Sequence, residues 1–445
     1  MKGKILTIVL LVCILLFTGC SGQDNYNIET QTEIANEFMN DYYNHNYDSI
    51  LSNYGMTAQI KLAISEELLV KTENDVKIQA GDFVGLIDEL TTQEVRDGYN
   101  FYVFTAEHKF KNVNWVLAFN SNDELANFTI SEMKSNVTHT LSDGLVSEEV
   151  SFGREPLNIT GELISNSKNN NGKYAIIVSG SGANFRYGDV GPNAIYYNLA
   201  NELAKNGTNV LIYDKRTSLY PEAFLDDYDI NDEVVEDVVF AKEFLCEKYS
   251  ADSKDIFIIG HSLGGYTIPL IAEDIDGDIG GYIPLCAPST SISELALYQV
   301  EYLADLDGNI TDEEKNQIDM FNAYAENISM LDEKNASKYP PQALMNAHAN
   351  YWLSLEGYAP EQLYDDINER VMFIYGSKDY QVPLYEMDSY KYVLGDNDNI
   401  EFVLIDGMTH ILINSTSERP EPKDYNLQTT VNNQLVMIIT DFITK

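Results

Sequence analysis

The chain has 445 residues, 44% of them hydrophobic, which is enough for one large buried core and a second, smaller domain. Its 28 Lys and Arg residues stand against 70 Asp and Glu residues, so the formal net charge is −42. Binding to phosphate needs a basic face, and this charge balance therefore argues against nucleic acid as a partner. Acidic surfaces of this kind are typical of proteins that work outside the cytoplasm.

The first twenty residues have the pattern of an export signal. Two lysines precede an apolar run at 5–17 that is short for a membrane span. The run ends in Phe17-Thr18-Gly19-Cys20, which resembles a bacterial lipobox with Phe in place of the usual Leu. The resemblance implies a signal peptide at 1–19, a lipid on Cys20, and a protein anchored on the extracytoplasmic face of a bacterial cell membrane. An ordinary signal peptide with an incidental cysteine is the alternative.

A polar linker at 20–28 leads to a predicted small α+β domain at 29–134. An apolar helical stripe comes first, formed by Ile34, Phe38 and Tyr42. Strand patterns follow at 83–95, 99–110, 113–119 and 125–130. Lys111-Asn112 is predicted to form a hairpin turn. A helix on an antiparallel sheet resembles the cone-shaped domains of the nuclear-transport-factor-like superfamily, and no catalytic set of residues is predicted here.

Strands and helices alternate over the remaining residues, 142–445. An antiparallel pair is predicted at 146–152 and 157–164. Further strands are predicted at 174–178, 209–213, 255–259, 281–285, 371–375 and 400–405. Helices are predicted at 194–205, 232–248 and 263–273, with a closing helix through Val431, Leu435, Ile438 and Phe442. This alternation indicates an α/β fold, a doubly wound and mostly parallel sheet covered on both faces. Its site should lie at the carboxyl ends of the strands.

One window has the form of a nucleophile elbow. A short apolar strand runs into Gly260-His261-Ser262-Leu263-Gly264, a G-x-S-x-G motif, and a helix pattern follows. Such a strand-to-helix turn strains the serine backbone and leaves no room for side chains at the glycine positions. Ser262 is therefore the predicted nucleophile, and it needs a base and an acid from elsewhere in the chain.

The base and the acid should follow the serine in chain order, the acid first. Only His348 and His410 follow Ser262. His410 comes just after a predicted strand, whereas His348 lies inside a helical insertion, so His410 is the predicted base. Asp379 follows the preceding strand and is the predicted acid; Asp406 is its rival.

A serine hydrolase also needs two backbone N–H groups that bind the oxyanion of the tetrahedral intermediate. The residue after the nucleophile, Leu263, supplies the first. The glycine-rich loop Ser179-Gly180-Ser181-Gly182 leaves an early strand at the required place, so Ser181 is predicted to supply the second.

These motifs together resemble the α/β-hydrolase superfamily, and most closely its bacterial esterase, thioesterase and serine-aminopeptidase-like branch. The resemblance covers about residues 145–445. The motifs that carry it, in family order, are Gly180-Ser181-Gly182, Tyr213-Asp214-Lys215-Arg216, Gly260–Gly265, Gly376–Pro383 and Thr409-His410. Two positions depart from the family pattern, since Ser179 stands where His is usual and Thr217 where Gly is usual.

A long helical insertion at 288–365 separates two of the predicted strands. Insertions at this point form a lid that sets substrate choice, and a simple surface spacer is the alternative. Its aromatic and apolar residues are candidates for an acyl pocket or for the core of the lid: Tyr298, Tyr302, Met320, Phe321, Tyr324, Tyr351 and Trp352.

No metal or organic cofactor is predicted. Two Asp-rich segments, 274–278 and 305–309, hint at calcium, but the second is too short for an EF-hand loop. Thr311 and Glu314 after it instead predict a helix capping box. Cys246 and Cys286 are expected at opposite ends of the sheet, too far apart for a disulfide, so both are predicted to be buried free thiols.

The sequence thus predicts an exported serine hydrolase that cleaves carboxylic esters of a small-molecule acyl substrate through Ser262, Asp379 and His410. Its activity should fall in acid as His410 becomes protonated. A serine aminopeptidase of the proline-iminopeptidase type and an acyl-thioesterase or acyltransferase stay open as alternatives. So does a non-catalytic surface lipoprotein that binds a ligand. No oligomeric state is predicted.

Overall fold

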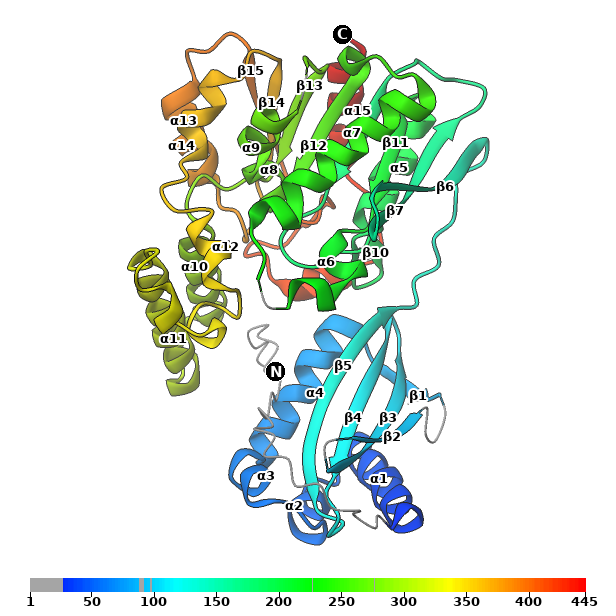
Figure 1. The fold of residues 1–445 in the computed structure, drawn as a ribbon, viewed down its shortest axis with the longest axis vertical. Helices are drawn as coiled ribbons and strands as arrows, with labels where there is room; N and C mark the ends of the chain where they lie inside the picture. Colours follow the sequence, from blue (N-terminus) through cyan, green and yellow to red (C-terminus); the bar gives the residue numbers. More distant parts are fainter. Residues whose placement is uncertain (1–26, 88–91, 97, 226, 276) are drawn as a thin grey trace. The chain divides into compact units, whose positions relative to one another are not determined.

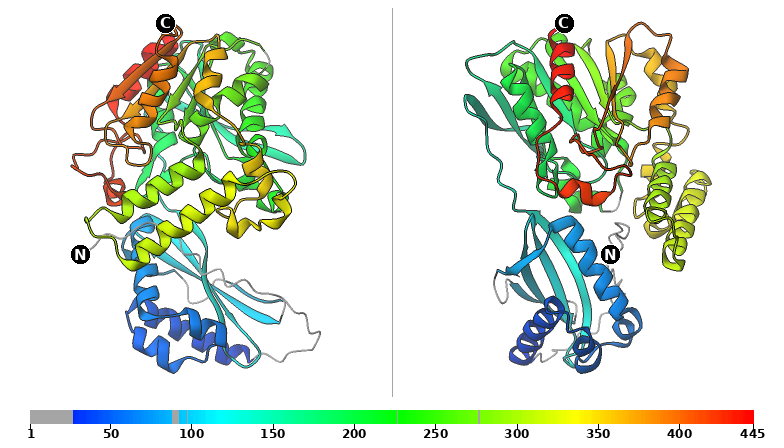
Figure 2. Two further views of the ribbon diagram at one scale, coloured as in Figure 1. Left: turned by 90° about the vertical axis from the view of Figure 1, so that its left-hand side faces the viewer. Right: turned by 180° about the vertical axis from the view of Figure 1, so that it is seen from behind.

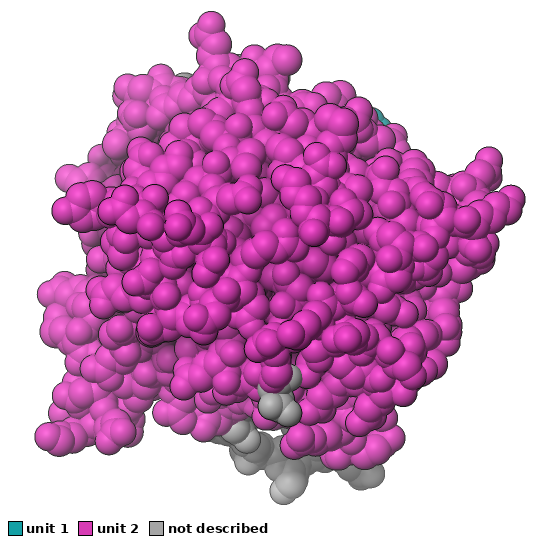
Figure 3. Space-filling model, turned by 90° about the horizontal axis from the view of Figure 1, so that it is seen from above, with its two compact units in different colours: residues 1–138 teal, residues 139–445 magenta. Residues whose placement is uncertain are grey.

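The computed structural model describes residues 27–87, 92–96, 98–225, 227–275 and 277–445. The predicted signal peptide, Cys20 and most of the predicted linker lie outside the described residues. The chain divides into two compact units, residues 1–138 and 139–445, which are coloured separately in Figure 3. No helix among the described residues is long and apolar enough to cross a membrane.

The first unit packs helices against an antiparallel sheet (Figure 1). Its helices are α1 (Ile28–Tyr43), α2 (Tyr47–Asn53), α3 (Ala58–Ala63) and α4 (Glu66–Ala80). Its strands are β1 (Phe83–Leu86), β2 (Thr92–Arg96), β3 (Tyr99–His108), β4 (Lys111–Phe119) and β5 (Leu125–Ser135). The predicted helical stripe is buried, since Phe38 and Tyr42 of α1 pack edge-on against Phe128 of β5. Aromatic side chains therefore fill the space between α1 and the sheet.

Two sequence predictions for this unit are wrong. The strand predicted at 83–95 is two strands, β1 and β2, which pair with different halves of β3. The hairpin turn lies at Lys109-Phe110, and Asn112 is already paired with Glu107 in the ladder. The buried Phe110 donates its N–H to the carbonyl of Ala80 at 2.7 Å, and this tertiary contact removes it from the strand.

The second unit is built on a mixed sheet whose eight strands, within the described residues, have the order β15-β14-β13-β12-β8-β11-β7-β6. Their bounds are β6 (Leu145–Arg154), β7 (Leu157–Asn166), β8 (Tyr174–Val178), β11 (Asn209–Tyr213), β12 (Ile256–His261), β13 (Gly281–Leu285), β14 (Val371–Gly376) and β15 (Ile400–Ile405). The strands from β15 to β11 are parallel, and β7 and β6 add an antiparallel edge. The predicted strands and their mostly parallel arrangement are confirmed.

Helices cover both faces of this sheet. In Figure 1, α7 (Glu236–Tyr249) and α9 (Ile268–Asp274) lie in front of the sheet, with α5 (Ile195–Lys205) and α15 (Asn433–Thr444) behind it; the view from behind in Figure 2 brings α15 forward. The remaining regular helices of this layer are α6 (Arg216–Leu219), α8 (Leu263–Tyr266) and α14 (Leu384–Leu394), and α7 is preceded by a π-helical turn at Asn231–Val235. Short 3-10 turns occur at Pro221–Phe224, Ser253–Asp255, Ala336–Lys338, Pro341–Ala343, Tyr364–Asp366 and Pro422–Asn426, and a small hairpin is formed by β9 (Asp189–Val190) and β10 (Asn193–Ala194).

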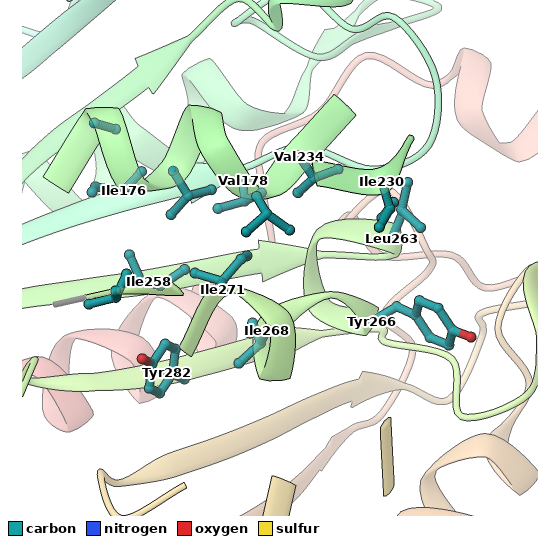
Figure 4. Packing of buried hydrophobic residues seen from close by; sticks show 14 of the residues in the cluster. Ile176, Val178, Ile230, Val234, Ile258, Leu263, Tyr266, Ile268, Ile271 and Tyr282 are labelled. Atoms are coloured by element: carbon teal, nitrogen blue, oxygen red, sulfur yellow. The ribbon is translucent and has the colours of Figure 1, made fainter. Parts of the chain in front are cut away.

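The helix predicted at 263–273 is two helices. α8 ends at Tyr266 and α9 begins at Ile268, because Pro269 in the first turn of α9 has no N–H with which to continue a helix from α8. Figure 4 shows side chains of β8 and β12 gathered with those of α8 and α9. Every residue of β12, the strand that carries the elbow, is buried.

The insertion between β13 and β14 is helical, as predicted, with α10 (Ile292–Ala304), α11 (Asp312–Ser329), α12 (Ala349–Leu353) and α13 (Pro360–Leu363). The predicted capping box of Thr311 and Glu314 is present at the start of α11. Asp305 accepts a hydrogen bond of 2.9 Å from Arg419. The other Asp-rich segment includes Asp276, which lies outside the described residues.

Candidate active site

The elbow at Ser262 has the geometry that its sequence predicts. Ser262 has φ 55° and ψ −118°, outside the regions that L-residues normally occupy. A Cβ at Gly260 would collide with the carbonyl oxygen of Gly264, and one at Gly264 would lie 2.6 Å from the carbonyl oxygen of Val178. The Ser262 N–H donates to the carbonyl of Leu285 at 2.9 Å, so β13 also holds the turn.

Asp379 and His410 meet in a buried pair at the ends of β14 and β15. His410 Nδ1 lies 2.7 Å from Asp379 Oδ2. Asp379 Oδ1 accepts the N–H groups of Gln381 and Val382, both at 2.8 Å. Because an ionised carboxylate can only accept, Nδ1 carries the proton, and in the neutral ring Nε2 is left with its lone pair. This is the tautomer that a general base requires.

The loop that carries His410 is attached to the elbow through His261, the neighbour of Ser262. His261 Nε2 donates to the carbonyl of His410 at 2.8 Å, and the two imidazole rings are 4.7 Å apart between centroids. The structure therefore brings Ser262, Asp379 and His410 to one end of the sheet. The two rivals are elsewhere: His348 donates to the Leu225 carbonyl beside α12, and the exposed Asp406 accepts from the Ser377 hydroxyl.

A carbonyl can only accept a hydrogen bond, so the His348 ring is the donor. Its Nε2, 2.7 Å from the Leu225 oxygen, carries the proton and donates it. His348 is thus engaged with a surface loop and does not share a contact with the elbow among the residues that the structure describes.

The loop 179–182 lies against the serine. A Cβ at Gly180 would be 3.3 Å from the Cβ of Ser262. The N–H of Gly180 donates to the Tyr196 hydroxyl and that of Gly182 to Glu233 Oε1, each at 2.9 Å. In the described part of the chain, the Ser181 N–H makes no hydrogen bond to an acceptor.

The N–H of Leu263, the first residue of α8, is likewise without an acceptor among the described residues. The two amides that the sequence predicts for the oxyanion are thus both without an acceptor among the described residues. Ser179, where the family usually has His, is buried, and its hydroxyl has no hydrogen-bond partner within the described ranges.

A buried lysine holds this loop, and the sequence prediction gave it no role. Lys215 lies two residues after the end of β11 and is fully buried. Its ammonium donates to the carbonyls of Gly180 at 2.7 Å and Gly182 at 3.1 Å, and to Glu233 Oε1 at 2.9 Å. Glu233 belongs to the π-helical turn before α7. The signal in the sequence is a lysine two residues after an apolar strand, at the end of the sheet where the site is predicted.

Tyr196 and His261 form a second connection that the sequence prediction missed. The Tyr196 hydroxyl accepts from the Gly180 N–H and lies 2.9 Å from His261 Nδ1. Since His261 Nε2 donates to the His410 carbonyl, Nδ1 must accept from Tyr196. Burial, with a smaller effect of the nearby His410, lowers the pKa of His261 to about 3. A neutral His261 thus links the 179–182 loop to the loop of the predicted base.

Cys286 lies beside the predicted acid. It follows β13 with φ 48°, and its Sγ and one ligand atom each of Asp379 and His410 all lie within 4.8 Å of one another. Burial, then the charge of Asp379 and a hydrogen bond to it, raise the pKa of the thiol. The three residues could hold a metal ion, but a metal needs a thiolate, which this environment disfavours, and it would compete with the Asp379–His410 hydrogen bond.

Both described cysteines are free, as predicted. The prediction that both are buried is wrong for Cys246, which is only partly buried on α7, with its Sγ 3.7 Å from the Ser253 hydroxyl. Cys246 lies in the last turn of the helix, which ends at Tyr249.

Comparison with known proteins gives matches to hydrolases. The prolyl oligopeptidase family matches residues 196–279, which include the elbow. The chain is 24% identical over 411 residues to Esterase EstD of Thermotoga maritima, covering 90% of this chain and 92% of that protein.

Among solved structures, the esterase domain from a Rhodothermus marinus protein aligns with a TM-score of 0.39 and 14% identity over 67% of this chain and 98% of its own. Est1E from Butyrivibrio proteoclasticus aligns with a TM-score of 0.39 and 17% identity over 66% of this chain and 96% of its own. The acylaminoacyl peptidase of Pyrococcus horikoshii aligns with a TM-score of 0.42 and 14% identity over 79% of this chain and 55% of its own.

The mixed sheet with its elbow and the similarities in sequence support a hydrolase of the α/β type. The similarity to Esterase EstD extends along nearly the whole chain and so spans both units.

Proposed function

We propose that this protein is a serine esterase of the α/β-hydrolase kind that forms an acyl-enzyme on Ser262. One observation carries the proposal: a buried Asp379–His410 pair, 2.7 Å apart, lies at the same end of the sheet as a serine held at φ 55°. Backbone strain of this kind is kept only where the surrounding structure enforces it, and it occurs most often at functional sites.

The proposed mechanism uses the residues as follows. Ser262 Oγ attacks the carbonyl carbon of the ester while His410 Nε2 takes its proton. The N–H groups of Leu263 and Ser181 bind the oxyanion. His410 returns the proton to the leaving alcohol, and water, activated by His410, then releases the acid from Ser262. Asp379 keeps Nδ1–H oriented throughout and balances the charge of the protonated ring.

An ester is the proposed bond because the relative that covers nearly the whole chain is named an esterase. A serine aminopeptidase is the second candidate, favoured by the match of residues 196–279 to the prolyl oligopeptidase family. An acyl-thioesterase or acyltransferase would use the same triad, but export from the cytoplasm would separate it from coenzyme A thioesters. The helical insertion 288–365 is proposed to act as the lid that selects the acyl group.

Export and lipid anchoring are part of the proposal and depend on the sequence of residues 1–20 alone. Cys20 would carry the lipid, and the hydrolase would work on the extracytoplasmic face of the membrane. Radiolabelled palmitate should enter the wild type and be lost in Cys20→Ala; label that persists in Cys20→Ala would contradict the anchor.

The decisive experiment is labelling of the full chain with a fluorophosphonate probe, with Ser262→Ala and Ser389→Ala side by side. Ser389 is an exposed serine on α14 and serves as the matched control. We expect labelling and ester hydrolysis in the wild type and in Ser389→Ala. In Ser262→Ala, labelling should vanish and kcat should fall by ~10³-fold or more. Full turnover by Ser262→Ala would refute the proposal.

A substrate panel then separates the candidates. Nitrophenyl esters of rising chain length, aminoacyl-naphthylamides and an acyl thioester are compared by kcat/KM at one pH. The proposed function requires the highest kcat/KM for an ester; preference for a naphthylamide with a free amino terminus would favour the aminopeptidase instead.

A further inference from the structure

Lys215 is a buried charged residue next to the site, and the proposed mechanism gives its contacts no role. A lysine is rarely fully buried, because removing an ammonium from water costs several kcal/mol unless paired. One pairing with Glu233 would satisfy the charge, yet the ammonium also donates to two backbone carbonyls of one loop, those of Gly180 and Gly182. Its three donors are therefore spent on that loop and on the residue that binds the loop.

The carbonyl of Gly180 and the N–H of Ser181 belong to one planar peptide group. In a trans peptide these two bonds point in opposite directions. Lys215 at 2.7 Å from the Gly180 oxygen therefore fixes the direction of the Ser181 N–H, the amide that has no acceptor among the described residues. A positive charge at the oxygen end also draws electron density from the nitrogen, which makes the N–H a stronger donor.

The N–H groups on either side of Ser181 are both hydrogen-bonded. The Gly180 N–H is held by Tyr196 and the Gly182 N–H by Glu233, so the peptide between them cannot rotate independently. Gly182 has φ 87°, a conformation open to glycine, and it turns the chain back toward Glu233. The loop is thus held by Tyr196, Glu233 and Lys215 on both sides of the Ser181 N–H.

We propose that Lys215 is a positioning residue for the oxyanion hole: with Glu233 it orients and polarises the peptide between Gly180 and Ser181. The inference rests on the proposed function, since it assigns Lys215 to the oxyanion side of that same site. Lys215 does not touch the substrate, and its effect is confined to the stability of the tetrahedral intermediate and of the transition states around it.

The neighbouring buried ion pair, Arg216 with Asp237, makes different contacts from Lys215. Arg216 donates to Asp237, Glu236 and, at 3.4 Å, the Asp232 carbonyl, and it is also buried. These contacts join α6 to α7 and to the turn before it, and none reaches the 179–182 loop within the described ranges. Arg216→Gln is therefore the matched control. It removes a buried cation that is next in sequence while leaving the loop contacts of Lys215 in place.

The test measures kcat per active serine, with active serines counted by fluorophosphonate titration so that unfolded protein is excluded. In Lys215→Met, kcat per active serine should fall by about 10–100-fold, with KM within about threefold of wild type, because removing a whole oxyanion donor costs about 10²–10³-fold. The affinity for a trifluoromethyl ketone, which forms a tetrahedral adduct with the serine, should fall by the same factor. Arg216→Gln should lose thermal stability but keep kcat per active serine within about threefold.

A double variant covers the case in which Lys215→Met does not fold. Removing the lysine alone leaves Glu233 buried and unpaired, whereas Lys215→Met combined with Glu233→Gln leaves no charge behind and should fold. It lacks the ammonium on the Gly180 carbonyl, so the same 10–100-fold loss of kcat is expected. A folded single or double variant with kcat per active serine within threefold of wild type overturns the proposal.

The two hypotheses fail in different ways. If the wild type is not labelled, or if Ser262→Ala turns over, the proposed function fails. If the wild type depends on Ser262 while the Lys215 variants keep both kcat and ketone affinity, only the role of Lys215 fails.

Discussion

The acid–base side of the site presents side chains, whereas the oxyanion side presents backbone. At the ends of β14 and β15, Asp379 and His410 meet through one direct hydrogen bond of 2.7 Å. At the ends of β8 and β11, the proposed donor is the Ser181 N–H, and the side chain of Lys215 acts on it only through the Gly180 carbonyl. Ser262 lies where the two sides meet.

The difference predicts how each side responds to substitution. Removing a side chain on the acid–base side removes a chemical group that takes part in the reaction. Removing one on the oxyanion side leaves the N–H in the chain and changes only its direction and polarity. Substitutions on the acid–base side should therefore cause larger losses of activity than substitutions on the oxyanion side.

Asp379→Asn should give the largest effect. The amide can donate to His410 Nδ1, which stabilises the tautomer with the proton on Nε2, the wrong nitrogen for a base. We expect kcat to fall by about 10³–10⁴-fold while fluorophosphonate labelling becomes slow, in line with the loss seen for the same change in serine proteases. Stopped-flow measurement of ester hydrolysis at pH 7–8 checks this.

Asp406→Asn is the matched control for that prediction. Asp406 is exposed and accepts a hydrogen bond only from Ser377 among the described side chains, although it lies four residues before His410 in the sequence. Its kcat should stay within about threefold of wild type, as for most surface substitutions. Equal losses in both aspartate variants would remove the assigned role of Asp379.

The sequence predicted the strands that lead to Asp379 and His410, but not the contacts of Lys215 and Tyr196 on the oxyanion side, and the reason is physical. The strands before Asp379 and His410 are apolar runs bounded by polar residues, and β13, β14 and β15 were predicted to within one residue. Parallel strands bring their carboxyl ends to one edge, so the side chains that follow them can be placed without a structure.

Contacts that position a backbone N–H leave no pattern of this kind in the sequence. Lys215 meets the Gly180 carbonyl, and Tyr196 meets His261, only because β8, β11 and β12 are neighbours in the folded sheet. The wrong hairpin turn near Phe110 has a similar cause, since a tertiary contact with Ala80 overrides the local pattern. Propensity and spacing describe local structure, and these contacts are not local.

His261 connects the two sides of the site. Because the folded protein keeps its ring neutral, His261 should have the next largest effect, on how stability depends on pH. Its pKa is lowered to about 3 by burial, against about 6.5 in the unfolded chain. Between these values the unfolded state binds one more proton than the folded state, so stability rises with pH and is lost as pH falls below about 6.5. The contribution of this one group approaches ~1.4 kcal/mol per pH unit between pH 6 and pH 4. His261→Gln should reduce the slope of unfolding free energy against pH by up to that amount.

The two tryptophans allow this to be measured on the second unit alone. Trp115 belongs to the first unit and the buried Trp352 to the second, so urea unfolding followed by fluorescence in a Trp115→Phe background reports residues 139–445. His348→Gln is the control, because that imidazole hydrogen-bonds a surface loop instead of the core, and its slope should stay close to wild type. An unchanged slope in His261→Gln would mean that His261 is not held neutral by the fold.

Cys286 should give the smallest effect and belongs to the acid–base side. Its sulfur lies within 4.8 Å of an Asp379 carboxylate oxygen. Burial first, then the charge of Asp379 and a hydrogen bond to it, raise the pKa of the thiol, so the sulfur stays protonated across the working range. A donor on Asp379 makes the carboxylate less able to stabilise a protonated His410. Cys286→Ala should therefore move the acid limb of kcat/KM to higher pH, and Cys286→Ser, with a stronger donor, should move it to lower pH.

The expected displacements are about 0.2–0.5 pH unit, because a weak neutral donor is exchanged next to a carboxylate that already accepts three hydrogen bonds. Cys246→Ala is the matched control on α7, away from the triad, and its profile should overlay that of wild type. Opposite shifts in the Ala and Ser variants would show that the thiol acts through Asp379, because a packing defect would lower the rate without moving the limb in two directions. If both variants instead shift the limb the same way, or not at all, Cys286 only fills space at the end of β13.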